Sequence, residues 1–289
     1  MTMRFITVVV LSMLLTGMRS DKPAYLIFTS EGKEINYSKM MKELQGADII
    51  FFGELHDNPV SHWLELEITH DLFGIKKEKL ILAAEMFETD NQVLINEYLS
   101  GLLTDARFEE EARLWRNYST DYKPLLKFAV ENKLHFVASN VPRRYASMVA
   151  KAGFGVLDTL SDVAKEWIAP LPVAYDPELK CYRDMLRMGH SGDAPVNLNL
   201  PKAQALKDAT MAWSVLKAFS PGQTIVHFNG SYHSDWHQGI VWHIRQQRTE
   251  LKISTIATVL QDEMKELNTG YVGQADFIIV VPSRMTRTY

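Results

Sequence analysis

The sequence is poor in cysteine, with one residue in 289, and it lacks a strong excess of charge of either sign. Since Cys181 has no second cysteine to pair with, an internal disulfide framework is excluded. The 31 basic and 35 acidic residues leave a net charge of -4, which gives no long-range attraction for phosphate backbones, so nucleic acid is not an expected partner. With 46% hydrophobic and 23% charged residues, the composition indicates a folded globular protein.

Several motifs are missing as well. The chain has no Gly-x-Gly-x-x-Gly, Walker loop or Gly-x-Ser-x-Gly, which counts against dinucleotides, nucleoside triphosphates and a serine hydrolase. Without Cys-x-x-Cys-His, covalent c-type haem is excluded. His233 and His237 are four residues apart, but Ser234 follows the first histidine where zincins have glutamate, so the zinc-protease motif is absent. His62 and His70 are interpreted as rim or surface positions of a helix.

The chain begins with Arg4 and a run of about eleven mostly apolar residues, too short for a bilayer span of about 20 and typical of a secretory signal. Residues 1–17 are therefore predicted to be a signal peptide, followed by a mature chain of residues 18–289. Residues 15–17, Leu-Thr-Gly, also resemble the segment before the acylated cysteine of a bacterial lipoprotein, but Met18 stands where that cysteine would be. We expect a protein released in soluble form or a lipoprotein whose cysteine was replaced; an ordinary signal peptide is the alternative.

The remaining sequence alternates short apolar runs with helical patterns. This alternation predicts an α/β fold with a mainly parallel β-sheet flanked by α-helices. Asn58 and Pro59 mark the start of one helix, and a second is expected from Pro201 to Phe219. Residues from about 91–132 and 158–200 have helical patterns and few strand-like runs, so we expect a smaller all-helical subdomain there. The strands are predicted at Tyr25–Thr29, Asp48–Phe52, Lys79–Ala84, His135–Ser139, Thr224–Phe228, Ser254–Val259 and Phe277–Val281.

Four of these strands run directly into polar clusters. The clusters contain Glu54 with His56, Glu85, the segment from Asn140 to Tyr145, and His233. Because the carboxyl ends of parallel strands share one edge, where open α/β sheets bind ligands, the sequence predicts a site there. Glu54 and His56 emerge together from a buried strand, which favours a functional or site-structuring role over chance. Glu85 fits a paired structural carboxylate almost equally well.

Taken together, these clusters resemble the ChaN family of bacterial haem-binding lipoproteins, within the Tiki and erythromycin-esterase-like superfamily. The resemblance implies a parallel sheet with a smaller helical domain, non-covalently bound haem b, a role in haem and iron acquisition, and an outer-membrane haem receptor as a partner. Family members are outer-membrane lipoproteins, whereas Met18 predicts a soluble periplasmic form of this chain. The matching segments are Gly53–Asp57, Ala84–Glu88, Asn140–Tyr145, Gln204–Ala212 and Gly230–His233.

Tyr145 is the predicted iron ligand, because ferric iron is a hard cation that accepts a phenolate. It follows Arg143 and Arg144 near the start of a predicted helix, where positive charge and the helix dipole favour the phenolate. Tyr182 is the second candidate and Tyr232 a third. The alternative for Tyr145 is a core tyrosine whose hydroxyl bonds to the backbone.

The haem propionates need cationic or hydrogen-bonding partners. Arg144, Lys151 and His190 are the candidates, and the sequence does not rank them. A single tyrosine ligand leaves the other haem face as an exposed apolar patch. We therefore predict a homodimer that forms around haem.

The resemblance also leaves a hydrolase open, because the corresponding glutamates and histidines of esterase-like and Tiki-like relatives serve hydrolysis. Glu54, His56, Glu85 and His233 would then activate water, directly or through a metal, in an exported enzyme. Haem would bind elsewhere on Tyr145, so the two functions need no common pocket. Haem binding and transport are favoured over an enzyme, and a periplasmic scaffold that contacts a receptor is the third alternative.

Overall fold

A computed structural model describes residues 22–188 and 196–289; residues 1–17, Met18 and His190 lie outside the described residues. Its strands form one eight-stranded sheet in the order β2-β1-β8-β7-β3-β6-β4-β5. β1 runs antiparallel to β2 and β8, and the other neighbours are parallel. The predicted α/β class with a mainly parallel sheet is therefore confirmed. The strands are β1 Leu26–Thr29, β2 Glu34–Ile35, β3 Ile49–Glu54, β4 Leu80–Glu88, β5 His135–Asn140, β6 Thr224–Gly230, β7 Ile253–Gln261 and β8 Phe277–Pro282.

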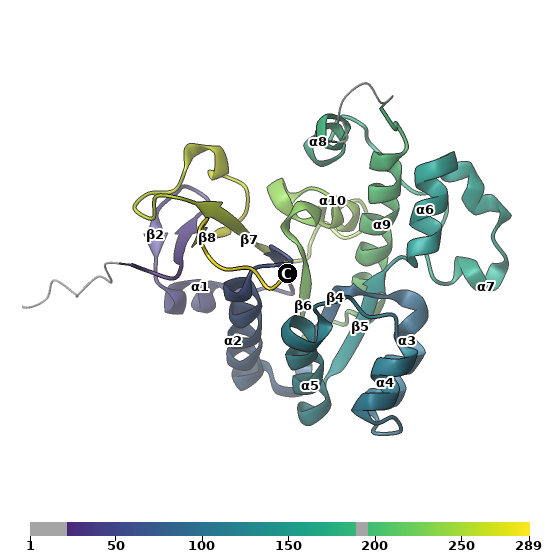
Figure 1. Cartoon of the computed structure of the whole chain (residues 1–289), viewed down its shortest axis with the longest axis horizontal. Helices are drawn as coiled ribbons and strands as arrows, with labels where there is room; N and C mark the ends of the chain where they lie inside the picture. Colours follow the sequence, from purple (N-terminus) through teal and green to yellow (C-terminus); the bar gives the residue numbers. More distant parts are fainter. Residues whose placement is uncertain (1–21, 189–195) are drawn as a thin grey trace, which may run out of the picture.

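Helices cover both faces of the sheet (Figure 1). Neighbouring residues of a strand point to opposite faces, so Phe52 of β3 packs beneath α2 and α5, whereas Phe51 packs against α9 and α10. Strands covered on both sides are rich in Val, Ile, Leu and Phe, as this sequence predicted. The helices that make these contacts are α2 Pro59–Lys76, α5 Lys123–Asn132, α9 Leu200–Ala218 and α10 Ile240–Arg245.

Helix α2 begins where the sequence predicts. The Asn58 side chain accepts hydrogen bonds from the backbone N–H groups of Val60 and Ser61 at 3.0 and 3.1 Å, and Pro59 occupies the first turn. Buried residues recur every fourth position as far as Leu72. This stripe fixes α2 on the sheet and points its first turn at the carboxyl end of β3.

The two helical stretches pack in different places. Between residues 91 and 132, side chains such as Tyr98 and Phe108 join the same hydrophobic core as the sheet. Between residues 158 and 188, Ala164 and Ile168 pack with helices α6 and α9. The idea that these stretches form a separate subdomain stays a prediction. The elements involved are α3 Gln92–Leu99, α4 Asp105–Glu111, the π-helix Tyr118–Tyr122, α6 Arg143–Ala152, α7 Asp162–Lys165 and α8 Lys180–Met188.

Gly53 allows three elements to meet at the carboxyl edge of the sheet. A Cβ atom at this position would lie 2.7 Å from the backbone oxygen of Ile256 in β7 and 2.8 Å from the Cα of Ser231, just after β6. Both neighbours are backbone atoms, which have little freedom to move aside. Glycine therefore lets β3 deliver Glu54, the next residue, to the centre of this edge.

Neither outer strand of the sheet, β5 or β2, presents a long row of free backbone groups. At β5, the Gln92 side chain donates to the backbone oxygen of Phe136 at 2.9 Å and accepts from the N–H of Ala138 at 2.7 Å. At the opposite end, β2 has two residues.

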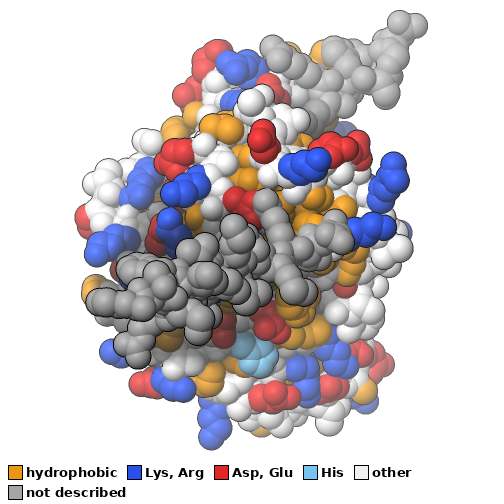
Figure 2. Space-filling model, turned by 90° about the vertical axis from the view of Figure 1, so that its left-hand side faces the viewer, with side chains coloured by type: hydrophobic (Ala, Val, Ile, Leu, Met, Phe, Trp, Pro, Cys, Tyr) orange, Lys and Arg blue, Asp and Glu red, His pale blue; other side chains and the backbone are white. Residues whose placement is uncertain are grey.

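Among the described residues, no helix is long and apolar enough to cross a membrane. Figure 2 shows a face on which basic and acidic side chains are interspersed with hydrophobic ones.

Candidate functional site

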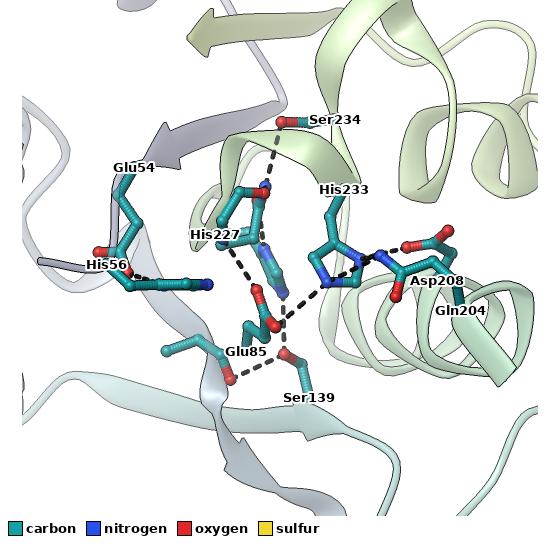
Figure 3. A network of polar contacts seen from close by, with 12 residues as sticks. Glu54, His56, Glu85, Ser139, Gln204, Asp208, His227, His233 and Ser234 are labelled. Carbon is teal, nitrogen blue, oxygen red and sulfur yellow. Dashed lines mark hydrogen bonds and ion pairs between the residues drawn. The ribbon is translucent and has the colours of Figure 1, made fainter. Parts of the chain in front are cut away.

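Four predicted site residues come together at the carboxyl ends of β3, β4 and β6 (Figure 3). Glu54 ends β3, His56 follows it, and Glu85 lies in β4 where its register with β5 becomes irregular. His233 lies in a short 3₁₀ turn after β6. Because β6 runs between β3 and β4, these side chains converge on one point of the sheet edge.

Glu54 and His56 form a hydrogen-bonded pair. His56 Nδ1 lies 2.5 Å from Glu54 Oε1, which also accepts a hydrogen bond from the Tyr122 hydroxyl at 2.7 Å. Burial alone would raise the pKa of Glu54, but hydrogen bonds from His56 and His62 outweigh it and hold the pKa well below its ordinary value. Burial would lower the pKa of His56, yet the bond to Glu54 and the charge of Glu85 raise it.

His56 is the accessible member of this pair. Its side chain is 34% exposed, whereas that of Glu54 is fully buried, and its ring packs edge-on against Trp115 with centroids 4.9 Å apart. A Cβ at Gly230 would lie 2.7 Å from His56 Nε2, and the Gly230 N–H donates to Glu85 Oε2 at 2.8 Å. Gly230 thus makes room for Nε2 beside Glu85.

His233 is held between two buried carboxylates. Its Nε2 lies 3.1 Å from Glu85 Oε1, and its Nδ1 bonds to Asp208 on α9. Burial alone would lower the pKa of His233, but Glu85 and Asp208 raise it to about 10. Burial would likewise raise the pKa of Glu85, yet the charge and hydrogen bond of His233 lower it to about 2. At neutral pH the centre therefore contains an imidazolium between two carboxylates, with the Gln204 amide against the ring.

A further layer of hydrogen bonds supports Asp208. The Tyr182 hydroxyl donates to Asp208 Oδ2 at 2.9 Å and lies 3.2 Å from His243 Nε2. Tyr182 is fully buried, and burial followed by the charge of Asp208 raises its pKa far above the ordinary value. Tyr182 is therefore neutral, and the hydrogen bond that its hydroxyl donates holds the Asp208 carboxylate in position.

A series of hydrogen bonds links Ser139, His227 and Asn229 beneath the centre. His227 Nδ1 is 3.0 Å from Asn229 Oδ1, and its Nε2 is 2.8 Å from the Ser139 hydroxyl. Burial lowers the pKa of His227 to about 4, so this ring is neutral. Because Ser139 and His227 are both completely buried, a substrate has no access to this serine. Instead, the hydrogen bond between Ser139 and His227 links β5 to β6 near Glu85 (Figure 3).

His62 contradicts the sequence interpretation. The sequence predicts a rim or surface position, but His62 is 7% exposed and bonds to Glu65, whereas His70 is exposed as expected. His62 and Glu65 are three positions apart on α2, which places both on the buried face of the helix. The spacing shows only that they share a face, so the sequence contains no signal that this face is buried. The structure also adds Asp208, which the sequence placed in a family-like segment without a role.

Three of the predicted haem residues, Arg144, Tyr145 and Lys151, lie on α6, which follows β5. Tyr145 is 6% exposed, and its ring packs in the apolar cluster of α6, α7 and α9. The hydroxyl accepts a hydrogen bond from Arg144 Nη2 at 3.2 Å, and the guanidinium lies 4.5 Å from the ring centroid. Arg144 also pairs with Asp90 at 2.6 Å. Lys151 is exposed seven residues after Arg144, about two turns along the same face, and His190 is outside the described residues.

Fold and site together define an α/β protein with a glutamate-histidine centre at the carboxyl edge of its sheet. The profile of the family described as haem-binding uptake, Tiki superfamily, ChaN matches residues 40–244, and the chain belongs to that family. The resemblance inferred from the sequence is therefore confirmed. A search of curated proteins gives no match.

Two solved structures illustrate the relationship. The chain is similar to ChaN of Campylobacter jejuni, described as showing cofacial heme binding, with 18% identity, a TM-score of 0.68 and coverage of 90% of this chain and 97% of that chain. It is also similar to a mutant of the erythromycin esterase EreC in its open conformation, with 13% identity, a TM-score of 0.48 and coverage of 89% and 83%. The first likeness shows a shared fold.

Proposed function

We propose that this protein binds haem b without a covalent link, with Tyr145 as the iron ligand, and takes part in haem and iron acquisition. Membership of a haem-binding uptake family supports the haem. The observation that carries the choice of ligand is the hydrogen bond from Arg144 to the Tyr145 hydroxyl. The guanidinium places a hydrogen-bond donor and a positive charge beside the oxygen that we propose as the ligand, and ferric iron, a hard cation, accepts oxygen donors.

The residues on α6 fit haem in their chemistry. Tyr145 offers an oxygen donor within an apolar cluster that includes the partly buried Met148 and Trp167. Arg144 and Lys151 offer cations for the propionates on one helix face. Tyr182 is a weaker candidate, because it is fully buried and its hydroxyl bonds to Asp208. Since Tyr145 is 6% exposed, the proposal requires side chains around its hydroxyl to move when haem binds.

Haemin titration tests the ligand. The wild-type protein should give a tyrosinate-type absorption band, and Tyr145→Phe should remove the band and weaken binding by roughly 100-fold, because the metal loses its protein donor. Tyr271→Phe, which removes a hydroxyl that bonds to Leu260 in another part of the fold, is the matched control and should bind as the wild type does. An unchanged band in Tyr145→Phe and its loss in Tyr182→Phe would transfer the role to Tyr182.

We also propose that two haem-loaded chains pair through their haem groups. Cofacial heme binding is described for the related ChaN of Campylobacter jejuni, and one tyrosine leaves the second haem face exposed. Sedimentation of the titrated samples should give twice the monomer mass with haemin and the monomer mass without it. Equal masses in both samples would exclude a haem-dependent dimer.

We also propose that the protein is exported and that it receives haem from a receptor. Residues 1–17 act as a secretory signal, and Met18 in the position of the lipobox cysteine leaves the protein soluble in the periplasm. An outer-membrane haem receptor is the proposed supplier of haem. Cell fractionation of the full chain measures the location, and a cytoplasmic or membrane-anchored protein would contradict it.

A hydrolase is the second candidate, and one observation favours it: the partly exposed His56 is oriented by Glu54 and faces the Glu85–His233 pair (Figure 3). A histidine held by a carboxylate suits general-base activation of water. If the protein hydrolyses esters or peptides, His56→Ala should lower the rate by about 100-fold or more. The exposed His135, changed to alanine, is the control. Turnover without haem binding would favour this candidate, and equal turnover in both variants would eliminate it.

A further inference from the structure

We propose that Glu54, His62 and Glu65 form a binding site for one divalent transition-metal cation of the zinc type, buried between β3 and α2. One nitrogen or oxygen atom from each of the three side chains lies within 4.8 Å of the others. The site is distinct from the predicted haem ligand on α6.

The spacing of the donor atoms suits a metal. His62 Nδ1 lies 3.2 Å from Glu54 Oε2 and 3.2 Å from Glu65 Oε2. Ligands about 2 Å from zinc, at tetrahedral angles, are themselves roughly 3.3 Å apart. An imidazole with two carboxylates is also a donor set found in zinc sites. The backbone therefore places these side chains where a shared cation would hold them.

Two of the donors are incompletely satisfied. Both carboxylates are fully buried in their side chains. Among the described residues, Glu65 Oε1 has no hydrogen-bond partner, and Glu54 Oε2 has only the ion pair with His62 Nδ1. Buried carboxylate oxygens without partners are costly, and two neighbouring carboxylates repel each other. A divalent cation removes both costs, because it neutralises the charge and occupies the open lone pairs.

The second nitrogen of His62 is arranged as in known metal sites. Its Nε2 lies 3.2 Å from the backbone oxygen of His56 and 3.4 Å from Asp121 Oδ2. A metal-bound histidine generally donates its other N–H to a carbonyl or carboxylate, which fixes the ring and its tautomer. Asn117 in turn donates to Asp121 Oδ2 at 2.7 Å. Nδ1 is thereby left to face Glu54 and Glu65.

The site lies beside a surface cavity. A surface cavity of about 330 Å³ is lined by His62 and Asp121, together with Trp63 and Thr120. A cation that enters this cavity meets the edge of the site formed by His62 and the Asp121 carboxylate. On the inner side, Glu54 Oε1 remains bonded to His56 and Tyr122, so the metal and the centre would share one carboxylate.

Calorimetric titration of the full chain with Zn²⁺, after treatment with a chelator and without haemin, tests the proposal. The wild type should bind one high-affinity ion per chain, and its thermal midpoint should rise with Zn²⁺. Glu65→Gln should weaken this binding at least about tenfold, because it removes one anionic ligand. Glu67→Gln, an exposed change on the same helix, should bind as the wild type does.

The variants are measured for unfolding without metal first, so that a folding defect is recognised. If Glu65→Gln does not fold, His62→Gln takes its place with the same expectation. Absence of high-affinity binding in the folded wild type would overturn the proposal. Binding of equal affinity in a folded Glu65→Gln or His62→Gln protein would also overturn it, because zinc would then be held elsewhere. Neither outcome bears on haem binding by Tyr145.

Discussion

Changing Asp208 to asparagine should lower the free energy of unfolding by about 3 kcal/mol, the lower end of the range for breaking a buried ion pair. Asp208 is 1% exposed and bonds to the His233 imidazolium. The amide of asparagine keeps the shape of the carboxylate but has no charge, and its nitrogen cannot accept a hydrogen bond from the Tyr182 hydroxyl. Glu85 still faces the other side of His233, which limits the loss.

Urea unfolding of the wild type and Asp208→Asn measures this difference. Glu250→Gln is the control, because it also removes a carboxylate from an ion pair, with Arg248, but on the surface. Exposed pairs contribute about 0 to 1 kcal/mol. A loss of less than about 1 kcal/mol in Asp208→Asn, equal to the control, would mean that the Asp208–His233 pair contributes no more to stability than a surface pair.

Raising the pH from 7 to 10 should remove on the order of 3 kcal/mol of stability through His233 alone. The folded pKa of His233 is about 10, above its ordinary value of 6.5, because Glu85 and Asp208 outweigh burial. A group with a raised pKa contributes fully below its unfolded pKa and loses that contribution as the pH rises through its folded pKa. Glu85, with a folded pKa lowered to about 2, loses its contribution only in acid, as the pH falls from 4.5 through 2.

Unfolding at pH 7, 8, 9 and 10 gives the test. In the wild type, the part of the decline that comes from His233 should continue to about pH 10, and His62, whose pKa is raised to about 11 by Glu54 and Glu65, adds a decline of its own in both proteins. In Asp208→Asn, the pKa of His233 has one carboxylate fewer to raise it, so the part that comes from His233 should end at a lower pH. A wild-type stability that stays level over this range would show that His233 does not bind its proton more tightly in the folded state. Identical pH profiles in the two proteins would show that Asp208 does not raise the pKa of His233.

The fold was largely predictable from local pattern. Buried parallel strands have continuous apolar runs, so all seven expected strands are present, each beginning or ending within a few residues of its predicted limit. All of these strands except β1 extend further at their carboxyl ends, and in β3 this is because Glu54 still pairs with a neighbour. The missed strand, Glu34–Ile35, has two residues and offers no pattern to detect. The packing of residues 91–132 and 158–188 against different parts of the fold depends on tertiary contacts, which periodicity does not record.

The site was predictable in part for the same reason. Parallel strands carry their last residues to one edge, so Glu54, Glu85 and His233 could be placed together without knowledge of the fold. Asp208 and His62 could not, because both lie on helices and meet the centre through helix packing. A histidine on a helix gives the same sequence signal whether it faces water or a buried carboxylate. The charge state of His233 likewise depends on two carboxylates from different elements.

The outer strands determine how molecules of this protein can associate. A bare strand at the end of a sheet is a template on which another polypeptide can extend the ladder, the first step toward aggregation. At β5 the Gln92 amide already fills a donor and an acceptor that such a polypeptide would need, and β2 is too short to offer a register. Self-association by sheet continuation is thus disfavoured at either end, which leaves the helical faces for any specific contact between copies.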